Sequence, residues 1–171
     1  MKTKLIILVS FFLMALTSEK SFGQSYLNFE TVNASSLNNS KLRIDTLQKV
    51  VVYLPKNYDN SNKNYPVLYY LPGFTSPIKE FLFGEYSGFE LQKVADSLIE
   101  RELINEMIIV LVDGNTFLGG SFYVNSPING NWEDYIVNDV VHYIDRKYKT
   151  KPSPNSRAIA GNSMGALALY T

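Results

Sequence analysis

A serine between two glycines is the most informative chemical feature of the sequence. Residues 161–165 read Gly-Asn-Ser-Met-Gly, which is the G-x-S-x-G pattern of a nucleophile elbow. In such an elbow the serine lies on a tight turn between a strand and a helix, with its hydroxyl above a sheet. The backbone N–H of the next residue then faces the reacting carbonyl group. We therefore predict Ser163 as a nucleophile and the Met164 N–H as an oxyanion donor; the alternative is a structural glycine turn with a bystander serine.

The partners that a serine nucleophile needs do not follow it in the sequence. In this type of site the chain order is Ser, then Asp or Glu, then His. Residues 166–171 contain neither an acid nor a histidine, and the one histidine, His142, precedes Ser163. A serine hydroxyl without a base is a poor nucleophile. We therefore expect the chain to be the amino-terminal part of a longer enzyme and to be inactive alone.

Two other polar residues, His142 and Asp113, have interpretations that do not involve catalysis. On a helix, His142 lies about 200° from Val140 at about 100° per residue, so it points away from the apolar stripe. We expect it to be a solvated surface histidine. Asp113 ends an apolar segment and precedes Ser163, so we expect it to orient the following loop rather than to act as the catalytic acid.

The elements that must position these residues follow from hydrophobic periodicity. Strands are predicted at residues 48–54, 67–71, 107–112 and 156–160, and the first two could pair as an antiparallel hairpin. A helix is predicted within residues 89–104, and a second one starts with Asn131 as N-cap. The residues expected on the buried face of the second helix are Ile136, Val137, Val140, Val141, Ile144 and Tyr148. Strands alternating with helices indicate an α/β fold with an open, mostly parallel sheet. Ligands then bind beyond the carboxyl ends of its strands, after Leu71, Val112 and Ala160.

The composition is that of a globular protein and excludes several classes of site. The 171 residues are 46% hydrophobic and include 16 basic and 16 acidic side chains, so no electrostatic argument favours nucleic acid as a partner. There is no cysteine, which excludes disulfides, thiolate nucleophiles and cysteine-based zinc sites. With a single histidine, a histidine-rich metal site is excluded as well. We expect neither a metal nor an organic cofactor.

The first residues have the pattern of a secretory signal peptide. Lys2 and Lys4 precede an apolar segment at residues 5–16, and small and polar residues follow up to Gly23. That apolar segment is shorter than the roughly 20 residues of a membrane span. We therefore expect residues 1–23 to be a signal peptide, residues 24–171 to be the mature domain, and the protein to be secreted or periplasmic without a stable membrane span. The alternative is an uncleaved membrane anchor.

Three blocks of sequence carry a resemblance to a known family. They are residues 50–74, residues 107–145 and residues 156–169, and the last contains the serine motif. The chain resembles the esterase family of α/β hydrolases that contains esterase D, secreted feruloyl and acetylxylan esterases and mycolyltransferases. The middle block is most similar to the feruloyl-esterase-like branch. The resemblance implies an α/β-hydrolase fold, incomplete here.

The resemblance also implies an activity. The expected protein is a secreted serine carboxylesterase that cleaves acyl or feruloyl esters, with a carbohydrate ester as the substrate class. The family usually has His-Gly where this sequence has Pro72-Gly73, and the backbone N–H of Phe74 would complete the oxyanion hole. Ala166 replaces the last glycine of the family's motif. The alternatives are an acyltransferase on the same fold and a non-catalytic carbohydrate-binding relic.

Candidate substrate-binding residues lie in the long segment after residue 112. Tyr123, Asn125 and Trp132 are expected at the edge of the sheet where ligands bind, and an aromatic ring there can stack on a phenolic or sugar ring. The alternative for Trp132 is packing against the sheet. The aromatic stretch at residues 74–89 is interpreted either as a lid or acyl-side wall, or as a loop packed on the core.

Overall fold

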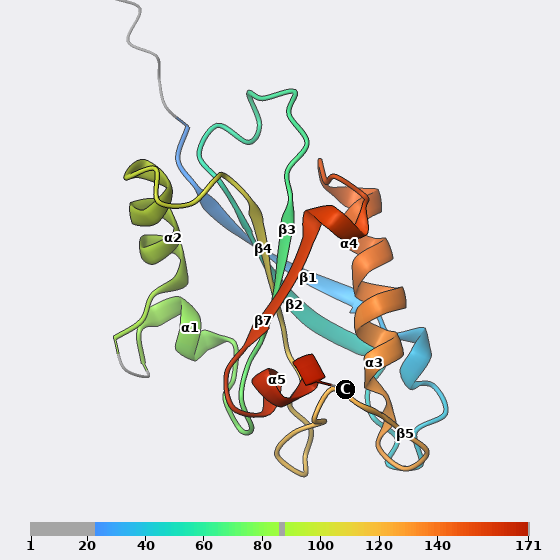
Figure 1. Ribbon diagram of the computed structural model, residues 1–171. Coiled ribbons are helices and arrows are strands. Elements are labelled where there is room, and N and C mark those ends of the chain that lie inside the picture. Colours follow the sequence, from blue (N-terminus) through green and yellow to red (C-terminus); the bar gives the residue numbers. More distant parts are fainter. Residues whose placement is uncertain (1–22, 86–87, 171) are drawn as a thin grey trace, which may run out of the picture.

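The computed structural model describes residues 23–85 and 88–170 of the chain. Within this part, a five-stranded sheet has the order β1-β2-β4-β3-β7 (Figure 1). Its strands are β1 (Tyr26–Asn33), β2 (Leu47–Leu54), β3 (Val67–Leu71), β4 (Ile108–Val112) and β7 (Arg157–Gly161). A separate two-stranded ladder joins β5 (Asn125–Ser126) to β6 (Gly130–Asn131). Of the predicted signal peptide, residues 1–22 lie outside the described residues.

The sheet is antiparallel in one half and parallel in the other. β2 pairs antiparallel with both β1 and β4, whereas β3 pairs in parallel with both β4 and β7. The carboxyl ends of β4, β3 and β7 therefore meet at the same edge of the sheet. The loops that follow these three strands are the ones in which the sequence predicts a site.

The four predicted strands are confirmed, with bounds that shift by one residue at most. The predicted hairpin between residues 48–54 and 67–71 is wrong, because β4 lies between β2 and β3 in the sheet. β2 forms its hairpin with β1 instead, in a register that pairs Tyr26 with Leu54. β1 is not among the predicted strands, because its residues are mostly half-buried or exposed and lack a continuous apolar pattern.

Helices cover both faces of the sheet. α1 (Lys79–Phe83) and α2 (Leu91–Glu100) lie on one face, and α3 (Trp132–Asp134), the π-helix η2 (Tyr135–Val140) and α4 (Val141–Lys147) lie on the other (Figure 1). α5 (Met164–Leu167) follows β7 directly. Short 3-10 helices are η1 (Ser35–Leu37), η3 (Pro154–Ser156) and η4 (Ala168–Tyr170). The predicted first helix is confirmed but is shorter than residues 89–104.

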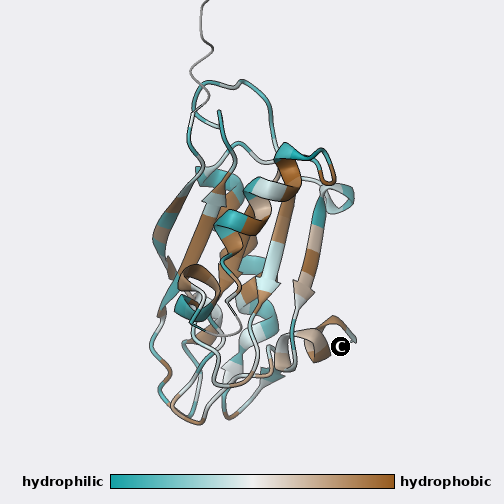
Figure 2. Ribbon diagram, turned by 90° about the vertical axis from the view of Figure 1, so that its left-hand side faces the viewer, coloured by the Kyte–Doolittle hydropathy of each residue, from teal (hydrophilic) through white to brown (hydrophobic). Residues whose placement is uncertain are grey.

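Successive side chains along a strand point to opposite faces of the sheet, and this alternation forms two hydrophobic layers. Val50 and Val52 of β2 face the core beneath α4, whereas Val51 and Tyr53 face the core beneath α1 and α2. Every residue of β4 is buried, because helices cover both of its faces. The strands carry much of the hydrophobic colour in Figure 2, whereas the loops at the top of that view are largely hydrophilic and those at the bottom are mixed.

The second helix differs from the prediction at two residues. Asn131 precedes it, but its side chain makes no capping hydrogen bond; Asn125 Oδ1 instead accepts one from the Asp134 N–H at 3.1 Å. Val137 was expected in the buried face and is 50% exposed. Residues 135–140 are π-helical, and the wider turn of a π-helix changes which of these residues face the sheet relative to a regular α-helix.

Glu30 connects the edge strand β1 to α4. Its Oε2 accepts hydrogen bonds from Tyr143 Oη and Lys147 Nζ, each at 2.6 Å, and its Oε1 accepts one from Tyr148 Oη at 2.6 Å. Burial raises the pKa of the Glu30 carboxyl, but these donated hydrogen bonds and the Lys147 charge outweigh burial and hold it below the usual value.

We expect Glu30→Gln to lower the free energy of unfolding by about 2 kcal/mol at neutral pH, since a hydrogen bond to a charged group contributes about 1.5–3 kcal/mol. The folded-state pKa of Glu30 lies below its unfolded value, so this contribution is present above the unfolded pKa and is lost as pH falls through the folded pKa. Urea titrations at neutral pH and at about pH 3 measure it. Glu102→Gln, at an exposed glutamate, is the control. Equal destabilisation by Glu30→Gln at both pH values would contradict the prediction.

Candidate active site

Ser163 lies on a strained turn between β7 and α5. Its backbone has φ of 50° and ψ of −114°, a left-handed conformation that a residue with a side chain rarely adopts. The residue is exposed, and the next two, Met164 and Gly165, are buried. A sharp turn with the serine on its outside is the geometry that the G-x-S-x-G pattern requires.

The flanking glycines let this turn approach the end of β3. A Cβ atom on Gly165 would overlap the Leu71 carbonyl oxygen, and one on Gly161 would overlap the backbone of Gly165. The Asn162 N–H donates to the same Leu71 carbonyl oxygen at 3.3 Å. Any larger residue at either glycine would force the elbow away from the sheet.

The loop after β3 lies directly beside the serine. A Cβ atom on Gly73 would be 3.2 Å from the Cβ atom of Ser163. Tyr70, near the end of β3, donates from its hydroxyl to Asn162 Oδ1 at 3.3 Å. The turn at residues 72–74, which contains the predicted donor Phe74, and the turn at Ser163 therefore form one corner of the molecule.

The segment after β4 connects these two turns. The Thr75 N–H donates to the Gly119 carbonyl oxygen at 3.0 Å, and Asn115 Nδ2 donates to the Ser76 carbonyl oxygen at 3.0 Å. On the elbow side, the Phe122 N–H contacts Met164 Sδ at 3.2 Å. Residues 114–123 are thus hydrogen-bonded to the loop after β3 and contact the elbow.

Asp113 orients this segment, as the sequence predicts. Its Oδ1 accepts hydrogen bonds from the Asn115 N–H at 2.9 Å and from Asn115 Nδ2 at 3.0 Å, which is an Asx-turn. Burial raises the pKa of the Asp113 carboxyl above its usual value, and the two hydrogen bonds from Asn115 oppose that shift.

Exposed aromatic rings surround the corner, and most of them were missed by the sequence analysis. Phe74 is 44% exposed, Phe122 is 45% exposed, and their ring centroids are 5.9 Å apart. Phe117, in the segment after β4, is 71% exposed. Phe117 and Phe122 could have been found from their position in a loop at the carboxyl edge of the sheet. We call Phe74, Phe117 and Phe122 the aromatic rim.

Of the three predicted substrate-binding residues, Tyr123 and Trp132 are buried, whereas Asn125 is exposed. Tyr123 is 2% exposed and Trp132 is 0% exposed, so neither ring has a free face on which a substrate could stack. Trp132 packs edge-on against Tyr135 and donates from Nε1 to the Asn129 carbonyl oxygen, which is the packing alternative of the sequence analysis. Asn125 caps the helix that starts at Trp132.

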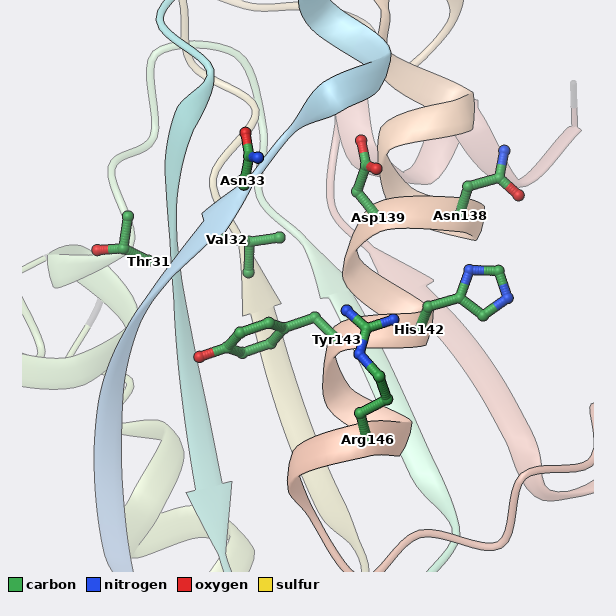
Figure 3. Close-up of a pocket in the computed structure, with 8 residues that line it drawn as sticks. All are labelled: Thr31, Val32, Asn33, Asn138, Asp139, His142, Tyr143 and Arg146. Atoms are coloured by element: carbon green, nitrogen blue, oxygen red, sulfur yellow. The ribbon is translucent and has the colours of Figure 1, made fainter.

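The polar pocket of Figure 3 is separate from this corner. It has a volume of about 370 Å³ between β1 and α4 and is lined by Thr31, Val32, Asn33, Asn138, Asp139, His142, Tyr143 and Arg146. His142 is exposed, as predicted. None of the residues that line this pocket belongs to the turns at residues 72–74 and 161–165. His142 therefore lines a different pocket from the corner that holds Ser163.

Comparison with known proteins identifies the family. The sequence model of the family described as "Putative esterase" matches residues 43–171. The chain belongs to this esterase family. Among curated proteins that match this chain, Esterase Rv1288 of Mycobacterium tuberculosis (strain ATCC 25618 / H37Rv) is 27% identical to it over 121 residues. These residues are 68% of this chain and 24% of that protein. An endo-1,4-beta-xylanase/feruloyl esterase of Xylanibacter ruminicola is 28% identical over 127 residues, 71% of this chain and 17% of that protein.

Solved structures share the fold of this esterase chain. A ferulic acid esterase superposes with a TM-score of 0.72 at 29% identity, covering 85% of this chain and 53% of that one. An S-formylglutathione hydrolase from Agrobacterium tumefaciens superposes with a TM-score of 0.61 at 18% identity, covering 89% of this chain and 57% of that one, which is a likeness of fold alone. The chain thus has part of the α/β-hydrolase fold and spans about a quarter or less of the curated relatives described above.

The strain at Ser163 predicts an order of stability for two substitutions. Ser163→Gly removes the Cβ atom that opposes a φ of 50°, whereas Ser163→Ala keeps it. We expect the glycine variant to be more stable than the alanine variant by about 1 kcal/mol, the usual size of such strain after the entropic cost of glycine. Urea unfolding of both variants measures the difference. A glycine variant less stable than the alanine variant would mean that the turn carries no strain.

Proposed function

We propose that this protein is a secreted serine carboxylesterase whose nucleophile is Ser163. The observation that carries the proposal is the left-handed backbone of an exposed serine, beside Gly73, at the carboxyl ends of the parallel strands. Membership of the esterase family supports the same reaction. In this reaction Ser163 Oγ attacks the carbonyl carbon of an ester, and the resulting tetrahedral oxyanion accepts hydrogen bonds from the backbone N–H groups of Met164 and Phe74.

The rest of the reaction follows from acyl-enzyme chemistry. Collapse of the tetrahedral intermediate breaks the ester bond, the alcohol leaves with a proton, and water then attacks the acyl-enzyme to release the acid. The proton transfers need a histidine and an acidic partner, which we propose are supplied by residues beyond Thr171. This is supported by the place of His142 in the pocket of Figure 3, whose lining includes no residue of the elbow, and by relatives that are longer than this chain.

The aromatic rim supports a substrate with an aromatic acyl group. Two exposed rings whose centroids are 5.9 Å apart offer faces and edges on which a phenolic ring can pack. Relatives named ferulic acid esterase and endo-1,4-beta-xylanase/feruloyl esterase point to the same class. We therefore propose feruloyl or related acyl esters of a carbohydrate as substrates.

We propose that the protein acts outside the cytoplasm, in the medium or the periplasm. The basis is the charged start, the short apolar segment and the small residues that lead to Gly23. In residues 23–85 and 88–170, no helix combines the length and the apolar character that crossing a membrane requires.

Activity measurements on Ser163→Ala test the nucleophile. In the complete gene product, with whatever follows codon 171, we expect hydrolysis of p-nitrophenyl acetate and a fall in kcat of at least about 10⁴-fold in the variant, as for loss of a catalytic serine. Ser153→Ala, outside the corner, is the matched control. Retention of most of the rate by Ser163→Ala would reject the nucleophile. Inactivity of the wild type would favour a carbohydrate-binding relic, and acyl transfer to an added sugar would favour the transferase.

A second substitution tests the aromatic rim. Phe122→Ala removes one of the two paired rings, so we expect the KM for methyl ferulate to rise about tenfold, since an aromatic contact contributes about 0.5–1.5 kcal/mol beyond its buried area. The KM for p-nitrophenyl acetate, whose acyl group is a single acetyl unit, should change less than twofold. Equal changes in KM for both substrates would show that the feruloyl group does not bind against Phe122.

A further inference from the structure

The hydroxyl of Tyr123 lies between the ends of the two central parallel strands. It donates to the Pro72 carbonyl oxygen at 3.1 Å, just after β3, and it lies 3.3 Å from the Val112 carbonyl oxygen, the last of β4. The side chain is 2% exposed, so water does not compete for these acceptors. Burial raises the pKa of this phenol, which therefore keeps its proton and remains a donor.

The Pro72 carbonyl group belongs to the first residue of the turn at residues 72–74, beside Ser163. Parallel pairing of β3 with β4 extends to Tyr70 and Leu111, so the chains beyond these residues need other contacts to stay in register. Proline has no N–H with which to continue the ladder. The Tyr123 hydroxyl contacts the Pro72 and Val112 carbonyl oxygens where the ladder ends, and it thereby fixes the start of the turn at residues 72–74.

The loop around Tyr123 is built to seat its ring. A Cβ atom on Gly114 would overlap the Tyr123 ring, and the Ser121 N–H donates to the Gly114 carbonyl oxygen at 2.9 Å. Phe122 and Tyr123 both have left-handed backbones, with φ of 58° and 54°. Two successive residues of this kind cost about 1–3 kcal/mol each, so they persist because the surrounding contacts impose them.

We propose that Tyr123 is a positioning residue for the oxyanion hole. Its hydroxyl fixes the Pro72 carbonyl group, which sets the orientation of the Gly73–Phe74 peptide and aims the Phe74 N–H at the oxyanion formed on Ser163. Tyr123 touches neither the substrate nor the reacting atoms. The inference rests on the proposed esterase activity and adds the side chain that orders one of its two oxyanion donors.

The kinetic test is Tyr123→Phe in the complete gene product, which removes one oxygen atom and keeps the ring. A misdirected oxyanion donor affects the transition state more than substrate binding, so we expect kcat to fall at least about tenfold while KM changes less than about twofold. Tyr65→Phe is the matched control, because that ring is 1% exposed and its hydroxyl has no hydrogen-bond partner in the described part of the chain. Equal kcat values for the two variants would overturn the proposal.

Hydrogen exchange in the complete gene product tests the positioning independently of activity. The amides of Thr75 and Ser76 are hydrogen-bonded to Gly119 and Gly73, so they report the order of this loop. We expect exchange in residues 73–76 to be at least about tenfold faster in Tyr123→Phe than in the wild type, and unchanged in Tyr65→Phe. Unchanged exchange in both variants would overturn the proposal. If the wild type is inactive but exchange is faster in Tyr123→Phe, the proposed esterase activity is rejected while Tyr123 is still shown to order the loop.

A second variant covers the case in which Tyr123→Phe does not fold. Gly114→Ala keeps the hydroxyl but displaces the ring that carries it. We expect the same acceleration of exchange in residues 73–76, together with the same selective fall in kcat. Wild-type exchange and kcat in folded Gly114→Ala would show that the loop does not depend on this tyrosine.

Discussion

The close approach of the serine turn to the end of β3 is the contact on which the rest of the candidate site depends. Gly165 lies so near the Leu71 carbonyl oxygen that only a hydrogen atom fits between them. This approach forces the abrupt reversal at Ser163 and leaves that residue with a left-handed backbone. The parallel pairing of β7 with β3 supplies the rigid support against which such a reversal can be held.

Three loops from neighbouring strands contribute to the corner, and each has a different task. In the proposed reaction the turn after β7 supplies the hydroxyl and the turn after β3 supplies a backbone N–H, while the segment after β4 contacts both turns. This division explains why the last segment is rich in glycine and aromatic residues. Its backbone must approach other chains closely, and its rings must fill the space between them. Residues with no chemical role, such as Asn115 and Tyr123, therefore determine where the chemical groups lie.

The sequence allowed the fold class, the family and the position of the elbow to be predicted, because these depend on local patterns. The apolar segment of β4 and the glycine-bracketed Ser163 each have a signature within a few residues. The order of strands could not be predicted in full, since β1 has no apolar alternation and the place of β4 between β2 and β3 is a long-range outcome. The burial of Tyr123 was missed, and the two alternatives for Trp132 stayed open, because polarity patterns do not reveal which aromatic residues of a loop turn inward. The nucleophile and its oxyanion donors stay a prediction.

The pairing of Leu71 with Gly161 has a kinetic consequence. These residues are far apart along the chain, so β7 is synthesised and can pair with β3 only after almost all of the described chain has been made. Contacts of such long sequence separation carry a high loop-closure cost and slow the folding of parallel sheets. The corner that holds Ser163 should thus be among the last parts of the sheet to order, whereas the β1–β2 hairpin, with its short connection, can form early.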